Sequence, residues 1–107
     1  MPRLTGRYAL VDQLIADGVT HVFGNPGTTE EAFMDVLQDY PRLQYVLALH
    51  ESVAAGIADG YARASGRPSF LQLHINPGLG NAVCMLYNSY RTRTPMVVYA
   101  GQHPQRG

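Results

Sequence analysis

Four short apolar segments that are typical of β-strands alternate with four segments that have the apolar spacing of helices. The expected strands are THVFG (20–24), QYVLAL (44–49), SFLQLHI (69–75) and PMVVYAG (95–101), and the expected helices cover 4–17, 28–40, 51–65 and a stretch that opens from NPGLGN (76–81) and runs to about 90. Because parallel strands need crossover connections, this alternation is typical of a parallel sheet covered on both sides. We therefore expect an α/β fold, with a doubly wound parallel sheet and helices on both faces.

Local signals refine this outline. Thr28 and Glu31 have the spacing of a capping box, which predicts that Thr28 caps the second helix. QYVLAL is almost continuously apolar, which is typical of a strand buried on both faces. NPGTT and NPGLGN are predicted to be turns because of their proline and glycine residues.

The composition limits the classes of partner. A chain of 107 residues is at most one domain, and its eight basic and eight acidic residues cancel, with no basic run that would indicate nucleic acid or a membrane surface. No stretch has the length of a bilayer span or the pattern of a secretory signal, and a cytoplasmic location is expected. Cys84 lies in an apolar helical pattern, so we expect a buried, unreactive thiol. No metal site is expected from the spacing of cysteine and histidine.

Two titratable residues fall where the expected strands end. In open parallel sheets, ligands bind outside the carboxyl ends of the strands. The turns that leave this edge are GNPGTT, LHES and HINPGLGN, and they carry Glu51 and His74. A carboxylate at the start of a helix can bind a ligand, or it can simply interact with the positive end of the helix. The position of Glu51 alone leaves both alternatives open.

These segments together resemble the N-terminal pyrimidine-binding domain of thiamine-diphosphate-dependent enzymes, in the branch of benzoylformate decarboxylase and acetolactate synthase-like proteins. The matching segments are GVTHVFGNPGTTEEAFMDVL, YVLALHESVAAGIADGYARASGRPSFLQLHINPGLGNA and SYRTRTPMVVYAGQ. The most specific of them is a glutamate followed by A-x-G-x-A-D-G-Y-A-R-x-S/T-G. Since family members are several-fold longer, the resemblance implies that residues 1–107 are a truncated N-terminal part of that domain, without the middle and diphosphate-binding domains.

The resemblance implies a cofactor-binding role for Glu51. Its carboxyl group would bond the aminopyrimidine nitrogen opposite the amino group and favour the imino tautomer, which then removes the thiazolium proton to give the ylid. A dry pocket would strengthen this shared hydrogen bond. The two glycine-containing turns would add further cofactor contacts, from Asn25, Pro26, Gly27, Gly78 and Asn81.

The resemblance also implies two substrate contacts. His74 matches an active-site histidine of the benzoylformate decarboxylase-like branch, where it would transfer protons or position a 2-oxo acid. The alternative is a histidine at a strand end that bonds only to backbone. Thr28 matches a small hydroxyl residue near the substrate carboxylate, and the alternative is a helix cap.

The implied function is that of a 2-oxo acid decarboxylase or carboligase that uses thiamine diphosphate. This chain would bind only the pyrimidine half of the cofactor, and Mg²⁺ would be held through a domain that is absent here. A homodimer or homotetramer is expected, with the Ala/Gly-rich helix after Glu51 as the contact. The alternatives are an inactive truncated module that binds a partner subunit, an acetolactate synthase-like carboligase, and a generic nucleotide-binding domain. We expect residues 1–107 alone not to decarboxylate benzoylformate or pyruvate.

Overall fold

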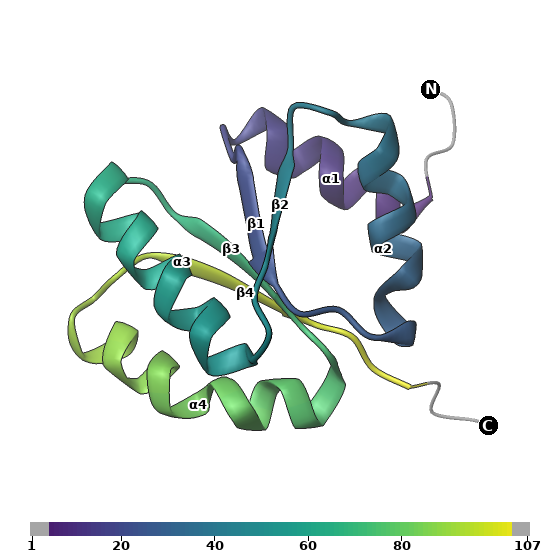
Figure 1. Cartoon of the computed structure of the whole chain (residues 1–107). Helices are drawn as coiled ribbons and strands as arrows, with labels where there is room; N and C mark the ends of the chain where they lie inside the picture. The colour runs from purple at the N-terminus through teal and green to yellow at the C-terminus, as the bar shows by residue number, and fades with distance from the viewer. Residues whose placement is uncertain (1–4, 104–107) are drawn as a thin grey trace.

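A four-stranded parallel sheet with the order β2-β1-β3-β4 forms the centre of the computed structural model, which describes residues 5–103 (Figure 1). The strands are β1 (His21–Gly24), β2 (Gln44–Leu47), β3 (Ser69–Leu73) and β4 (Met96–Ala100). The helices are α1 (Gly6–Ala16), α2 (Glu31–Val36), α3 (Glu51–Ser65) and α4 (Ile75–Arg91), with short 3₁₀ turns η1 (Thr28–Glu30) and η2 (Leu37–Asp39) on either side of α2. The predicted α/β fold is confirmed, although the expected first helical residue, Leu4, lies outside the described residues.

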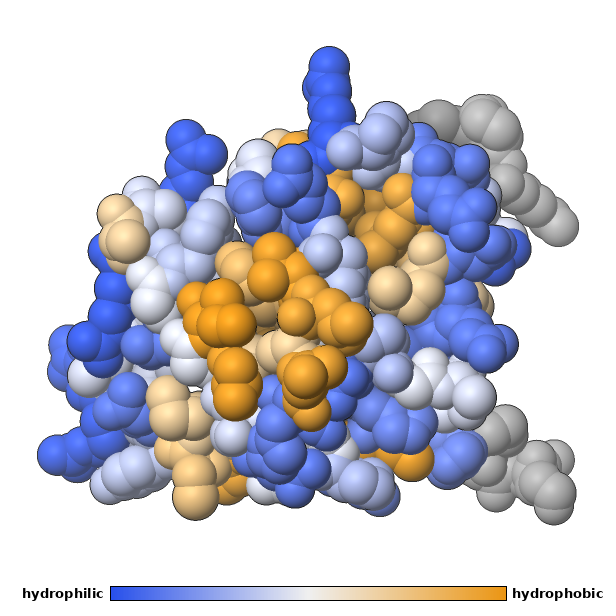
Figure 2. Space-filling model, viewed as in Figure 1, coloured by the Kyte–Doolittle hydropathy of each residue, from blue (hydrophilic) through white to orange (hydrophobic). Residues whose placement is uncertain are grey.

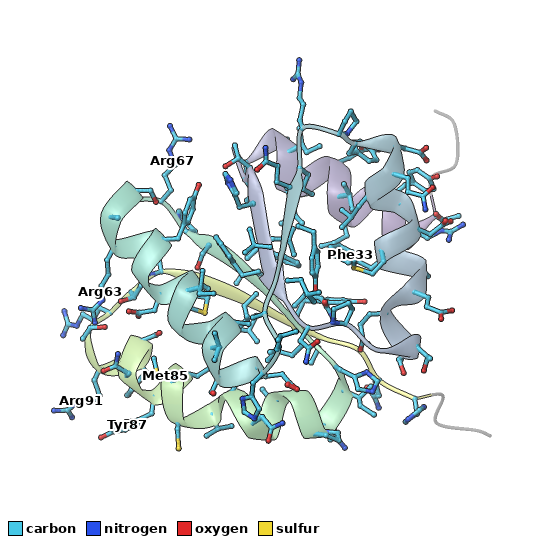
Figure 3. The ribbon with its side chains drawn as sticks, in the orientation of Figure 1. Phe33, Arg63, Arg67, Met85, Tyr87 and Arg91 are labelled. Carbon is cyan, nitrogen blue, oxygen red and sulfur yellow. The ribbon has the colours of Figure 1, made fainter. Side chains whose placement is uncertain are left out.

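Helices cover both faces of the sheet, as expected. Side chains alternate between the faces along a strand, so Phe70 and Leu71 of β3 enter different core clusters. One cluster joins the sheet to α1 and α2, and the other joins it to α3 and α4 (Figure 1). Phe33 points from α2 towards the sheet (Figure 3). This arrangement places the turns after β1, β2 and β3 at one edge.

Most alanines of α3 face the interior of this chain. Ala54, Ala55 and Ala58 are fully buried in the cluster that includes β3 and α4. Their short side chains let the helix lie close to its neighbours. A buried hydrogen bond of 2.7 Å from the Ser89 hydroxyl to Asp59 also joins α4 to α3. The buried alanines therefore serve packing within the chain, and a contact of this helix with a partner stays a prediction.

β2 is shorter and more exposed than predicted. It ends at Leu47, which is 59% exposed, and Leu49 beyond it is 90% exposed. β2 lies at the edge of the sheet and pairs only with β1, whereas the internal strand β3 is buried along its whole length. The prediction that QYVLAL is buried on both faces is wrong, because an apolar run does not distinguish an edge strand from an internal one.

NPGLGN lies inside α4, so the predicted turn at 76–81 is also wrong. The helix begins at Ile75, and the Gly78 N–H donates to the His74 carbonyl oxygen at 2.8 Å. Pro77 fits there because the first N–H groups of a helix have no partner within the helix. Proline and glycine, which suggested a turn, instead occupy the first turn of a helix.

The capping box is one residue earlier than predicted. Gly27 precedes η1, its N–H donates to Glu30 Oε2 at 3.0 Å, and the Glu30 N–H donates back to the Gly27 carbonyl oxygen at 3.1 Å. The predicted box between Thr28 and Glu31 is therefore wrong. Because Glu30 and Glu31 are adjacent, the sequence allows a capping box that ends at either residue. The structure uses Glu30, which is buried.

Cys84 is exposed, which contradicts the expected buried thiol. α4 packs on α3 through Ala82, Met85 and Ser89, whereas Tyr87 points outward (Figure 3). Apolar residues of α4 cover more of the helix surface than the part that packs against α3. The apolar neighbours of Cys84 in the sequence thus gave no measure of its burial.

Candidate functional site

Glu51 is the first residue of α3 and lies buried at the carboxyl edge of the sheet, with 8% of its surface exposed. The Asn81 side chain donates to its Oε1 at a long distance of 3.5 Å. Its Oε2 is buried and has no hydrogen-bond partner among the described residues. A buried carboxylate oxygen without a donor is costly, so this position favours a ligand that brings an N–H or O–H group.

The residue before Glu51 caps α3, and Glu51 itself does not. His50 is the N-cap of α3, and its Nδ1 accepts the Ser52 N–H at 3.1 Å. No capping hydrogen bond involves the Glu51 carboxylate. Glu51 lies in the first turn of α3, but its carboxylate oxygens do not cap the helix.

Gly78 lies close to both Glu51 and His74. A Cβ atom at Gly78 would lie 3.4 Å from Glu51 Cγ and 3.5 Å from the Cβ of His74. Both side chains therefore lie close to the same buried glycine of α4. Glu51, Asn81 and Gly78, all predicted to bind the cofactor, are thus brought together with the predicted substrate residue His74.

His74 ends the connection from β3 and precedes α4, and a third of its side chain is exposed. Its Nδ1 lies 2.8 Å from Glu30 Oε2. The imidazole ring packs against the backbone of Gly27, where a Cβ atom would overlap the ring. Gly27, predicted to contact the cofactor, therefore makes room for His74 in this chain.

Glu30 is the residue of this edge that the sequence analysis missed. It is completely buried, it accepts hydrogen bonds from the Gly27 and Ile75 N–H groups, and its Oε2 lies 2.8 Å from His74 Nδ1. The glycine-to-glutamate spacing of the capping box, in the register actually used, was the available signal. Hydrogen bonds from several N–H groups offset the cost of burying a carboxylate and fix its position.

The remaining predicted residues lie in the turn after β1. Asn25 and Pro26 are partly buried there, and Thr28 is exposed at the start of η1. Thr28 makes no capping hydrogen bond, so its alternative role as a helix cap is wrong. Its contact with substrate stays a prediction.

The free energy of unfolding should fall as the pH rises above about 10. Burial raises the pKa of the Tyr45 hydroxyl, and the charge of Glu30 raises it further. The folded chain then keeps a proton that the unfolded chain releases, so the unfolded state binds fewer protons and gains population with pH. Urea unfolding at several alkaline pH values measures the fall, and Tyr45→Phe should make it shallower. A wild-type stability that does not change in this range would contradict the expectation.

Two further classes of feature were sought within residues 5–103. No group of three or more histidine, cysteine, aspartate or glutamate side chains is placed to hold a metal ion. None of the helices in this range is long and apolar enough to cross a membrane.

Comparisons with known proteins agree on one family. Residues 4–107 match the family described as thiamine pyrophosphate enzyme, N-terminal TPP binding domain. A benzoylformate decarboxylase of Pseudomonas aeruginosa is 48% identical over 86 residues, which are 79% of this chain and 16% of that protein. The mitochondrial catalytic subunit of acetolactate synthase of Aspergillus candidus is 36% identical over 100 residues, which are 94% of this chain and 14% of that protein.

A solved structure gives the same result in three dimensions. A thiamine diphosphate-dependent 4-hydroxybenzoylformate decarboxylase of Rhodococcus jostii RHA1 superposes with a TM-score of 0.89 at 39% identity, over 95% of this chain and 19% of that one. The chain thus spans less than a fifth of the length of each of these relatives.

Proposed function

We propose, since this chain belongs to the thiamine pyrophosphate enzymes as their N-terminal TPP binding domain, that it supplies the aminopyrimidine half of a thiamine diphosphate site in a 2-oxo acid decarboxylase or carboligase. The observation that carries this proposal is the buried Glu51 carboxylate, whose Oε2 has no partner among residues 5–103. A ring nitrogen that shares a proton would meet the need of this carboxylate, so the residues fit the cofactor.

Each residue near Glu51 would have a defined task. Glu51 would hold a proton between its carboxylate and the pyrimidine ring, while Asn81 and the close packing of Gly78 keep the carboxylate in place. The bound cofactor would supply the electron sink for cleavage next to the oxo group. Asn25, Pro26 and Gly27 would line the cofactor from the turn after β1.

His74 and Thr28 would act on the substrate. His74 is partly exposed and lies next to the same glycine as Glu51, so its imidazole could exchange a proton with a bound 2-oxo acid. The exposed hydroxyl group of Thr28 would contact the substrate carboxylate. Mg²⁺ would be held, with the diphosphate, by a domain outside residues 1–107.

A second copy of the longer protein would pack on the outer faces of α3 and α4. Large exposed apolar side chains lie on these helices, namely Val53, Ile57, Val83, Tyr87 and Tyr90. Figure 2 shows apolar surface gathered on the face of the molecule where α3 lies. Exposed apolar surface of this kind is typical of an interface. Sedimentation velocity of an active longer protein tests the proposal, which a purely monomeric species would contradict.

Decarboxylation of an aromatic 2-oxo acid is the first candidate, because two similar solved structures are described as benzoylformate or 4-hydroxybenzoylformate decarboxylases. Sequence identity does not separate it from carboligation, since the benzoylformate decarboxylase and a putative acetolactate synthase large subunit of Mycobacterium tuberculosis are both 48% identical to this chain. The carboligase remains the second candidate, since relatives of both kinds match this domain. An inactive module that only binds a partner subunit is the third candidate.

A chimera tests the proposed function. Residues 4–107 replace the matching segment of the Pseudomonas aeruginosa benzoylformate decarboxylase, and the chimera is assayed with benzoylformate, thiamine diphosphate and Mg²⁺. We expect turnover that depends on added thiamine diphosphate, with the parent enzyme purified in parallel as control. A folded chimera that binds thiamine diphosphate without turnover would favour the inactive module, and one that does not bind it would contradict the proposal.

A further inference from the structure

We propose that Glu30 is a positioning residue that fixes the orientation and the tautomer of His74, so that Nδ1 carries the proton and Nε2 is left for a ligand. The use of His74 in catalysis rests on the proposed function. The arrangement of Glu30 and His74 does not, because it follows from contacts within the chain.

The Glu30 carboxylate is surrounded by N–H groups from two separate turns. It is 0% exposed. Its Oε2 accepts the Gly27 N–H at 3.0 Å and lies 2.8 Å from His74 Nδ1, while its Oε1 accepts the Ile75 N–H at 3.3 Å. Backbone N–H groups can only donate, and hydrogen bonds from them stabilise the charged form of a carboxylate. An ionised Glu30 can only accept, so the hydrogen atom of the third contact belongs to His74 Nδ1.

The packing around this carboxylate leaves little freedom. The imidazole ring lies against Gly27, where a Cβ atom would overlap it. Gly101, after β4, approaches Glu30 so closely that a Cβ atom there would overlap Oε1. The turns after β1, β3 and β4 therefore meet at one buried group, and His74 is held by contacts on its ring face and on Nδ1.

The backbone next to His74 supports the same inference. Ile75 has a φ of 41°, which is unusual and costly for a β-branched residue. Its N–H is bound by Glu30, so one carboxylate holds both the side chain of His74 and the backbone of the residue that follows it. Strained backbone of this kind persists where the surroundings determine it strongly.

The consequence for chemistry concerns the second ring nitrogen. In a neutral imidazole one nitrogen donates and the other accepts. With the proton on Nδ1, Nε2 presents a lone pair that can take a proton from a bound molecule and return it. Carboxylate–histidine pairs fix a histidine tautomer in this way in other settings.

The first test measures the tautomer of His74 by ¹⁵N NMR of the 107-residue chain labelled on histidine. In the neutral ring we expect the Nδ1–H form in the wild type. Glu30→Gln has nearly the same shape but carries no charge, so it should hold the hydrogen atom on Nδ1 less strongly and raise the share of the Nε2–H form. Glu31→Gln, a change at the adjacent exposed glutamate, should leave the tautomer unchanged. A wild type in the Nε2–H form would overturn the inference. This outcome is measured on the wild-type chain alone, so it does not depend on whether a variant folds.

The second test separates this inference from the proposed function. In an active chimera, Glu30→Gln should lower kcat by about 10²-fold with a much smaller change in KM, because a neutral amide no longer favours the Nδ1–H form of His74. If the tautomer moves and kcat does not, Glu30 is not a positioning residue for the reaction and the inference fails. If the chimera binds no thiamine diphosphate while the wild-type chain shows the Nδ1–H form, the proposed function fails and the structural part of the inference stands.

Discussion

Glu51→Gln should lower the benzoylformate turnover of the chimera by about 10²- to 10⁴-fold, which is the usual contribution of a positioned acid or base. Glutamine keeps the size and shape of the side chain, and its amide oxygen can still accept the long hydrogen bond from Asn81. The amide cannot take up and share a proton as a carboxylate does. The loss should therefore appear in kcat, and the fold should be unchanged.

Glu31→Gln is the matched control for this variant. Glu31 is exposed at the start of α2, and the same chemical change there should leave turnover within about twofold of the parent chimera. Circular dichroism and thermal unfolding of both variants check that they remain folded. Full turnover in Glu51→Gln would defeat the role that we propose for this carboxylate.

Gly24→Ala should destabilise the fold by about 2–4 kcal/mol, by overpacking at the end of an internal strand. Gly24 ends β1 between β2 and β3. A Cβ atom there would overlap the backbone carbonyl oxygen of Gln72 and the Tyr45 hydroxyl. The carbonyl oxygen belongs to β3 and cannot move without disturbing the sheet, so the strain has no easy relief.

Gly60→Ala provides the opposite expectation in the same chain. Gly60 lies inside α3, and a Cβ atom there would meet nothing within 4 Å. Because glycine lowers helix stability relative to alanine, the substitution should stabilise the chain by about 0.5–1 kcal/mol. Urea unfolding of both variants measures the difference. Equal stability of Gly24→Ala and the wild type would contradict the packing described here.

The order of the elements could be predicted from the sequence because local patterns determine it. Strands and helices differ in their apolar period, and alternation of the two leaves few topologies besides a parallel sheet. The position of a strand within the sheet could not be predicted in the same way. QYVLAL and SFLQLHI are both rich in apolar residues, but of these two strands β3 has a strand on each side and β2 has a strand on one side.

The candidate site was predictable in part. Glu51 and His74 were placed at the correct edge because Glu51 comes two residues after one predicted strand and His74 lies at the end of another. Glu30 was missed because its partners come from separate turns, and no local pattern shows that the turn after β1 meets the turn after β3. The proline and glycine residues of NPGLGN were similarly misleading, because they predicted a turn. Gly78 instead lies in α4, where its lack of a side chain lets the helix pack against Glu51 and His74.

The contact between Glu51 and the pyrimidine ring can be measured most directly by ¹⁵N NMR of thiamine diphosphate that is labelled at the ring nitrogen opposite the amino group. Bound to the chimera, this nitrogen should show the shift of a protonated or strongly hydrogen-bonded nitrogen, and the shift should be lost in Glu51→Gln. The same bound shift in the wild type and in Glu51→Gln would contradict the account, because another group would then hold the ring.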